Sequence, residues 1–68
     1  MDAVEMLVDE RGDLLRATWR DGDTAVELSL WRDDRCRATF QLNRDDAARL
    51  TRLLVIALAD GAMTPPAA

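Results

Sequence analysis

Few residues of this sequence can do acid–base or nucleophilic chemistry. There is one thiol, Cys36, and there is neither histidine nor tyrosine, so the commonest general base is missing. Cys36 falls at an alternate position of an expected strand, which is typical of a buried core cysteine and not of a nucleophile. The pairs Asp33–Asp34 and Asp45–Asp46 diverge on a turn or a helix start, which suits capping better than shared-proton catalysis. The sequence therefore predicts a protein that is not an enzyme.

Metal and cofactor sites are not predicted either. The segments "DERGD" at 9–13 and "DGD" at 21–23 lack the full ligand spacing and the distal glutamate of a calcium loop. One thiol without histidine cannot supply the four ligands of a structural zinc site. No glycine-rich phosphate loop is present. We expect no metal and no cofactor.

The remaining candidate functional residues are side chains that could bind a partner molecule. All nine basic residues are arginine, which the codon usage of a GC-rich genome is enough to explain. Strand alternation nevertheless gathers arginines on the expected outer face of a sheet, while most aspartates fall in turns. The predicted partner-binding face consists of Arg16, Arg20, Trp31, Arg35 and Arg37.

Three interpretations of this face stay open. Tryptophan and arginine dominate protein–protein hot spots, and tryptophan among arginines can also stack on nucleobases and hold phosphates. The third is an ordinary exposed strand face, in which Glu27 pairs with Arg16 or Arg37. The net charge of −4 and the pI near 4.5 disfavour nucleic acid and anionic membranes. We predict a protein partner, with nucleic acid as the alternative.

Period-two alternation indicates the elements that carry these residues. Strands are predicted at 3–8, 14–20, 24–32 and 35–42, and the short turns between them imply an antiparallel meander. The predicted inner face consists of Val4, Met6, Leu15, Trp19, Val26, Leu28, Leu30, Phe40 and Leu42, with Cys36 among them.

A single helix is predicted after the strands, from residue 44 to residue 60. Asn43 can cap its first turn, Asp45 and Asp46 suit the positive end of its dipole, and Gly61 is the expected C-terminal glycine. The stripe predicted to pack on the inner sheet face consists of Ala47, Leu50, Leu53, Leu54, Ala57 and Leu58. The predicted fold is thus α+β, in the order β-β-β-β-α, with residues 1–61 as one domain and 62–68 as a flexible tail.

The far side of this helix is also apolar in its second half. A chain of 68 residues buries only about 60% of its unfolded surface, so it needs additional stabilisation. With no disulfide and no metal expected, a homodimer is the remaining source, unless the helix end simply tolerates two exposed aliphatic residues. The predicted dimer interface consists of Ala48, Arg52, Val55, Ile56 and Ala59.

The stretch "VELSLWRDD" followed by "FQLNRDDAARLTRLL" resembles the last two strands and the helix of the PC4-like single-stranded nucleic-acid-binding fold. The similarity is one of layout and covers residues 14–60. It implies that two subunits pair through their helices, and it implies a transcriptional regulator that binds single strands.

The sequence also predicts a location. The first residues lack the features of a signal peptide, and the longest apolar run, "LLVIALA", is far short of the roughly 20 residues that span a bilayer. With one unpaired cysteine, we expect a cytoplasmic homodimer that does not bind membranes. Its expected role is regulatory or accessory, through binding to another protein.

Overall fold

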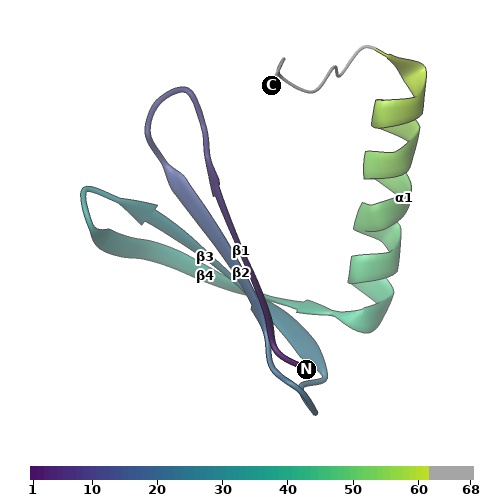
Figure 1. The fold of residues 1–68 in the computed structure, drawn as a ribbon, viewed down its shortest axis with the longest axis horizontal. Helices are drawn as coiled ribbons and strands as arrows, with labels where there is room; N and C mark the ends of the chain where they lie inside the picture. Colours follow the sequence, from purple (N-terminus) through teal and green to yellow (C-terminus); the bar gives the residue numbers. More distant parts are fainter. Residues whose placement is uncertain (62–68) are drawn as a thin grey trace.

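The computed structural model describes residues 1–61 (Figure 1). It contains β1 (Ala3–Val8), β2 (Leu14–Trp19), β3 (Ala25–Arg32), β4 (Arg35–Asn43) and α1 (Arg44–Asp60). The strands form one antiparallel sheet in the order β1-β2-β3-β4, followed by the single helix. This confirms the predicted α+β fold. The predicted tail at 62–68 lies outside the described residues.

Short turns with residues in the left-handed backbone conformation connect consecutive strands of the meander. Asp33 and Asp34 join β3 to β4 with φ of 53° and 60°, the conformation that a two-residue hairpin loop requires. Aspartate tolerates this region better than most residues. Gly22, with φ of 90°, serves the β2–β3 connection, where any side chain would be strained.

The strand register defines an apolar face of the sheet. Leu15 lies opposite Leu30, and Leu28 lies between Ala17 on one side and Phe40 on the other. Because cross-strand partners share a face, these rows align. The apolar face consists of Ala3, Leu7, Leu15, Ala17, Trp19, Val26, Leu28, Leu30, Ala38, Phe40 and Leu42, and Glu5 is a charged residue at its β1 edge.

The predicted face of β1 is wrong. Val4 lies opposite Thr18 and Met6 opposite Arg16, so these residues and Val8 lie on the other side of the sheet from Leu15. Periodicity shows that alternate residues share a face, and it favours the wholly apolar set of Val4, Met6 and Val8 as the inner one. The register instead places the other set, which includes the charged Glu5, on the side of Leu15. The loop between β1 and β2 sets the register, and it brings Leu7 to the apolar face.

Cys36 is also placed differently from the prediction. The β3–β4 register shifts between Leu30 and Trp31, so that Ala38 pairs with Leu30 while Cys36 pairs with Trp31. Arg37 is therefore the extra residue of a β-bulge, which shifts the alternation by one residue. As a result, Cys36 is exposed and lies opposite Trp31.

The ends of α1 are as predicted. The Asn43 side chain accepts a hydrogen bond of 2.8 Å from the backbone N–H of Asp46. Gly61 adopts the left-handed conformation with φ of 77°, and its N–H bonds to the carbonyl of Leu58. Both caps satisfy backbone groups that would otherwise be free.

The predicted packing of α1 on the sheet is wrong. No residue of α1 is buried, and Figure 1 shows the helix rising from the end of β4 and standing apart from the sheet. The reason lies at Asn43, which is both the last residue of β4 and the cap of α1. Strand–helix connections usually contain a few residues, and without them the chain cannot turn the helix back over the sheet.

Candidate interaction surfaces

The apolar face and the apolar residues of α1 are both open in the single chain. Among the described residues no apolar side chain is buried. Phe40 on the sheet is 56% exposed, and Leu53 and Ile56 on the helix are each 60% exposed. The helix stripe, defined as Leu50, Leu53, Leu54, Ala57 and Leu58, therefore lacks the contact with the sheet that its sequence predicts.

A groove of about 450 Å³ lies where the two apolar surfaces meet. Trp19, Val26 and Leu42 of the sheet form one wall, and Ala47 in the first turns of α1 forms another. Trp19 is held there by a 3.2 Å hydrogen bond from its Nε1 to the carbonyl of Asp23. The groove is mainly apolar and can receive side chains from another chain.

The predicted dimer residues all lie on α1. Ala48, Arg52, Val55, Ile56 and Ala59 are exposed, as are most residues of the helix stripe. The helix thus offers apolar side chains on more than one side, and all of them are accessible.

The opposite side of the sheet carries a polar network. Trp31 Nε1 donates a 2.9 Å hydrogen bond to Ser29 Oγ, which in turn donates to the carbonyl oxygen of Arg16 at 3.4 Å. Ser29 is only 3% exposed, which protects these bonds from water. The guanidinium carbon of Arg16 lies 5.2 Å from the centre of the Trp31 ring, within cation–π distance.

This surface is the arginine–tryptophan face, which we define by Val4, Met6, Val8, Leu14, Arg16, Thr18, Glu27, Ser29, Trp31, Cys36, Thr39 and Gln41. Its aliphatic members from β1 were predicted for the other side of the sheet. The face is therefore more apolar than the sequence indicates.

Only some residues of the predicted partner-binding face lie together in the structure. Arg16 and Trp31 are in contact, and Arg20 follows directly on β2. Arg35 lies opposite Arg32, one residue out of phase with Trp31, and Arg37 occupies the bulge. The bulge therefore separates the last two arginines from the regular alternation on which the prediction rests.

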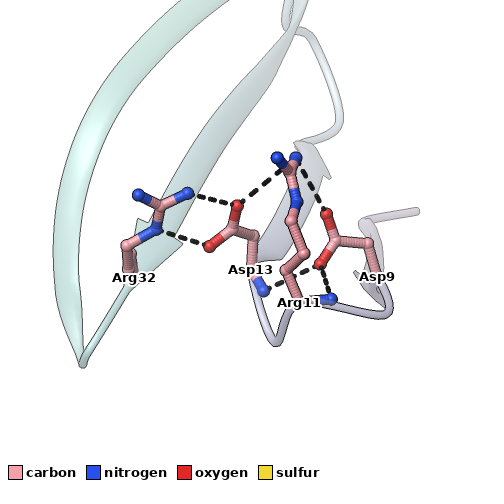
Figure 2. Close-up of polar contacts among 4 residues, drawn as sticks. All are labelled: Asp9, Arg11, Asp13 and Arg32. Carbon is pink, nitrogen blue, oxygen red and sulfur yellow. Dashed lines mark hydrogen bonds and ion pairs between the residues drawn. The ribbon is translucent and has the colours of Figure 1, made fainter.

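The buried Asp13 forms an ion pair with the exposed Arg32 that the sequence does not indicate (Figure 2). Its two carboxylate oxygens accept hydrogen bonds from Arg32 Nε and Nη2, each at 2.7 Å. Arg11 adds a longer contact of 3.8 Å. Asp13 is 7% exposed and lies in the β1–β2 loop, so the pair fastens this loop to the end of β3.

Hydrogen bonding and charge keep the Asp13–Arg32 pair ionised. The hydrogen bond from Arg32 lowers the pKa of Asp13, which desolvation by burial opposes and the charges of Arg32 and Arg11 support. The same hydrogen bond raises the pKa of Arg32. Asp9 closes the loop by accepting backbone hydrogen bonds from Arg11 at 2.9 Å and from Asp13 at 3.0 Å. This corner holds the hairpin and does not present a general acid.

Other chemistry-bearing groups are isolated in the described part of the chain. The Cys36 thiol donates a 3.7 Å hydrogen bond to the carbonyl of Ala38. Within residues 1–61 no cluster of acidic or thiol side chains has the arrangement of a metal site. Nor does that range contain a helix whose length and apolar character would let it cross a membrane.

Comparison with known proteins gives no match: no family model fits the sequence, and no curated protein or solved structure is significantly similar. The PC4-like layout thus finds no counterpart among these comparisons.

Proposed function

We propose that this protein is a homodimer whose apolar core forms between two copies of the chain, and that it acts by binding another protein. The observation that carries the dimer is the simultaneous exposure of the apolar face and of α1. A stable domain needs a buried apolar core, and the single chain buries no apolar side chain among its described residues.

The amount of exposed surface supports a second copy. The chain exposes 6063 Å², whereas a compact monomer of 7.6 kDa is expected to expose about 4,300 Å². The excess is larger than the ~800 Å² that each partner buries in a standard interface. The radius of gyration of 13.5 Å likewise exceeds the ~11 Å of a compact chain of this length.

Symmetry makes the same chain the simplest partner. In a two-fold pair, α1 of each copy can cover the apolar face of the other, with its first apolar side chains in the groove beside Trp19. Each copy then provides both of the surfaces that need covering. The far side of α1, at Val55 and Ile56, is available to pair the two helices. Each buried aliphatic side chain contributes roughly 1.5–3 kcal/mol.

The arginine–tryptophan face is the surface we assign to an external protein partner. The guanidinium of Arg16 covers one face of the Trp31 ring, so a nucleobase would have to displace it in order to stack there. Val4, Met6 and Val8 add exposed aliphatic surface to the same side. Aliphatic groups beside tryptophan and arginine favour a protein contact, and the net charge of −4 opposes nucleic acid.

The side chains that could carry chemistry support a binding role. A scaffold with an ionised Asp13 held in an ion pair, an isolated thiol and no histidine suits binding better than catalysis. We therefore assign the protein a non-enzymatic, regulatory or accessory role in the cytoplasm. PC4-like binding of single-stranded nucleic acid through Arg16, Arg20, Trp31, Arg35 and Arg37 is the alternative.

Sedimentation equilibrium tests the dimer. The wild type is expected at the mass of two chains, while Ile56→Arg is expected to give a monomer or an unfolded chain, because a charge at the interface cannot be buried unpaired. Arg49→Gln is the matched helical control and is expected to stay dimeric. A wild-type monomer, or a folded Ile56→Arg dimer, would contradict this interface.

Titration of labelled oligonucleotides tests the alternative. Stacking on Trp31 should quench its fluorescence, and the effect should weaken with salt. We expect no quenching at low salt, and a salt-sensitive quench would support the alternative instead.

A further inference from the structure

The two edge strands of the sheet differ in their protection. β4 carries Arg35 and Arg37, contains the β-bulge and continues into α1. Charges and bulges of this kind are what keep an edge strand from pairing with another chain. β1 is the other edge, and its sequence AVEMLV contains one charge, Glu5, and no proline.

The backbone of β1 is regular enough to accept another strand. Its register with β2 runs without a shift from Ala3 to Val8, and all six residues are exposed. In an antiparallel edge strand, alternate N–H and C=O groups point away from the only neighbour. These groups form a row of free donors and acceptors, which is the requirement for binding by strand addition.

The side chains beside this edge define what the added strand should carry. Val4, Met6 and Val8 are exposed on the arginine–tryptophan face, and Met6 is 62% exposed. A strand placed along β1 sets every second side chain next to these three residues. Aliphatic side chains at those alternate positions would complete the row.

A basic groove lies on the same side. It has a volume of about 260 Å³ and is lined by Val4, Met6, Thr18, Arg16 and Arg20, together with Asp2. The carboxylate of Asp2 accepts a 2.8 Å hydrogen bond from the backbone N–H of Asp21, so the two arginines outnumber the single acid. In residues 1–61 neither guanidinium forms an ion pair, and the buried Nε of Arg16 has no hydrogen-bond acceptor. The groove therefore offers apolar contact for the stem of a side chain and unpaired donors for a carboxylate, and glutamate has both parts.

We propose that β1 binds an extended segment of a partner protein by strand addition, with aliphatic side chains against Val4, Met6 and Val8 and a glutamate in the groove at Arg16 and Arg20. This inference rests on the protein-binding part of the proposed function and is independent of the dimer. The partner is an extended segment that carries aliphatic side chains at alternate positions, with a glutamate at one of them.

Fluorescence anisotropy with synthetic peptides tests the proposal on the full-length chain. The probe is a labelled peptide that alternates valine with threonine and has one valine replaced by glutamate. Its matched control has lysine in place of the glutamate, and we expect it to bind about tenfold more weakly because it brings like charges together. Equal binding of the two peptides would overturn the role of the groove.

N-methylated probes test strand addition itself. One peptide is methylated at the odd-numbered backbone nitrogens and the other at the even-numbered ones, with side chains unchanged. Only one set of N–H groups can face β1, so one peptide should lose binding by about tenfold or more while the other keeps it. Equal affinities for both would overturn strand addition.

Protein variants locate the site. Met6→Lys and Arg20→Gln are expected to weaken binding of the glutamate peptide by about tenfold, and Arg49→Gln on α1 is expected to leave it unchanged. Circular dichroism checks that each variant is folded. Because the N-methylated probes use the wild type, the proposal can still be refuted if a variant unfolds.

The mass of the protein in the same samples separates this proposal from the dimer. A dimer that binds none of the peptides overturns strand addition alone, whereas a monomer that binds the glutamate peptide overturns only the homodimer. If the peptide converts dimers to monomers, β1 is occupied by β1 of a second copy, and the external partner is refuted. Oligonucleotide binding that depends on Arg20, without peptide binding, refutes it as well.

Discussion

The two sides of the sheet differ in how many of their side-chain contacts are made within a single chain. On the arginine–tryptophan face, Trp31, Ser29 and Arg16 form a connected network of hydrogen bonds and a cation–π contact. The apolar face is not covered in this way, since Phe40 and its neighbours contact only one another and solvent. Directional polar contacts form between neighbouring strands, whereas an apolar surface needs a second layer. A single chain therefore completes its polar contacts, whereas its apolar face and the apolar side chains of α1 stay exposed to solvent.

The largest expected effect comes from comparing Phe40→Ala with Met6→Ala. In the single chain these side chains are 56% and 62% exposed, so a monomer would tolerate both changes about equally. If the apolar face is covered in the dimer, Phe40→Ala should cost about 3–5 kcal/mol and Met6→Ala within about 0.5 kcal/mol. Urea unfolding measures both, and equal small losses would contradict a covered apolar face.

A second comparison concerns the loop corner. Asp13→Asn removes the charge that two arginine nitrogens bind at 2.7 Å, so the unfolding midpoint should fall clearly. Arg11→Gln removes longer contacts of an exposed side chain, 3.5 Å to Asp9 and 3.8 Å to Asp13, and its midpoint should change little. Thermal unfolding followed by circular dichroism distinguishes the two. Equal midpoints for Asp13→Asn and the wild type would show that the ion pair is not needed to hold the hairpin.

The same corner predicts a dependence on pH. The hydrogen bond from Arg32 lowers the pKa of folded Asp13, while the unfolded value is about 3.9. The contribution of Asp13 is therefore fully present above the unfolded pKa and is lost as the pH falls through the lower folded pKa. The stability difference between wild type and Asp13→Asn should shrink below about pH 4. A difference that stays constant or grows in acid would contradict this assignment.

The smallest expected effect concerns Arg16. Arg16→Gln removes the cation–π contact with the half-buried Trp31, which contributes about 0.5–1 kcal/mol. It should also change the fluorescence of Trp31 without changing the mass of the protein. Arg49→Gln, which loses only an exposed 3.8 Å contact with Asp46, is the control. Dissociation of the dimer by Arg16→Gln would place this face inside the dimer interface.

Local signals predicted the elements of this fold well. The alternation in β3, the Asp33–Asp34 turn, the Asn43 cap and the Gly61 terminus each depend on neighbouring residues, and each is found as expected. The predicted face of β1 is wrong because its wholly apolar side, Val4, Met6 and Val8, is not the side that joins the apolar face, and only the register with β2 determines this. The position of Cys36 was mistaken because a bulge at Arg37 leaves no periodic signal.

The candidate surfaces were predicted only in part. Arg16 and Trp31 fall together because regular alternation connects them, whereas Arg35 and Arg37 lie beyond the bulge. The Asp13–Arg32 pair joins a residue of the β1–β2 loop to a residue of β3 that is 19 positions away, which no local pattern encodes. The apolar stripe of α1 indicates that the helix needs a cover, but an amphipathic pattern does not say which sheet provides it.

The unfolding midpoint as a function of protein concentration tests the central claim most directly. A core built between two copies is lost when they separate, so the midpoint in urea should rise steadily with concentration, alongside a two-chain mass in the folded baseline. A midpoint that stays the same over a wide range of concentration, with the mass of one chain, would show that a single copy folds alone with its apolar face open.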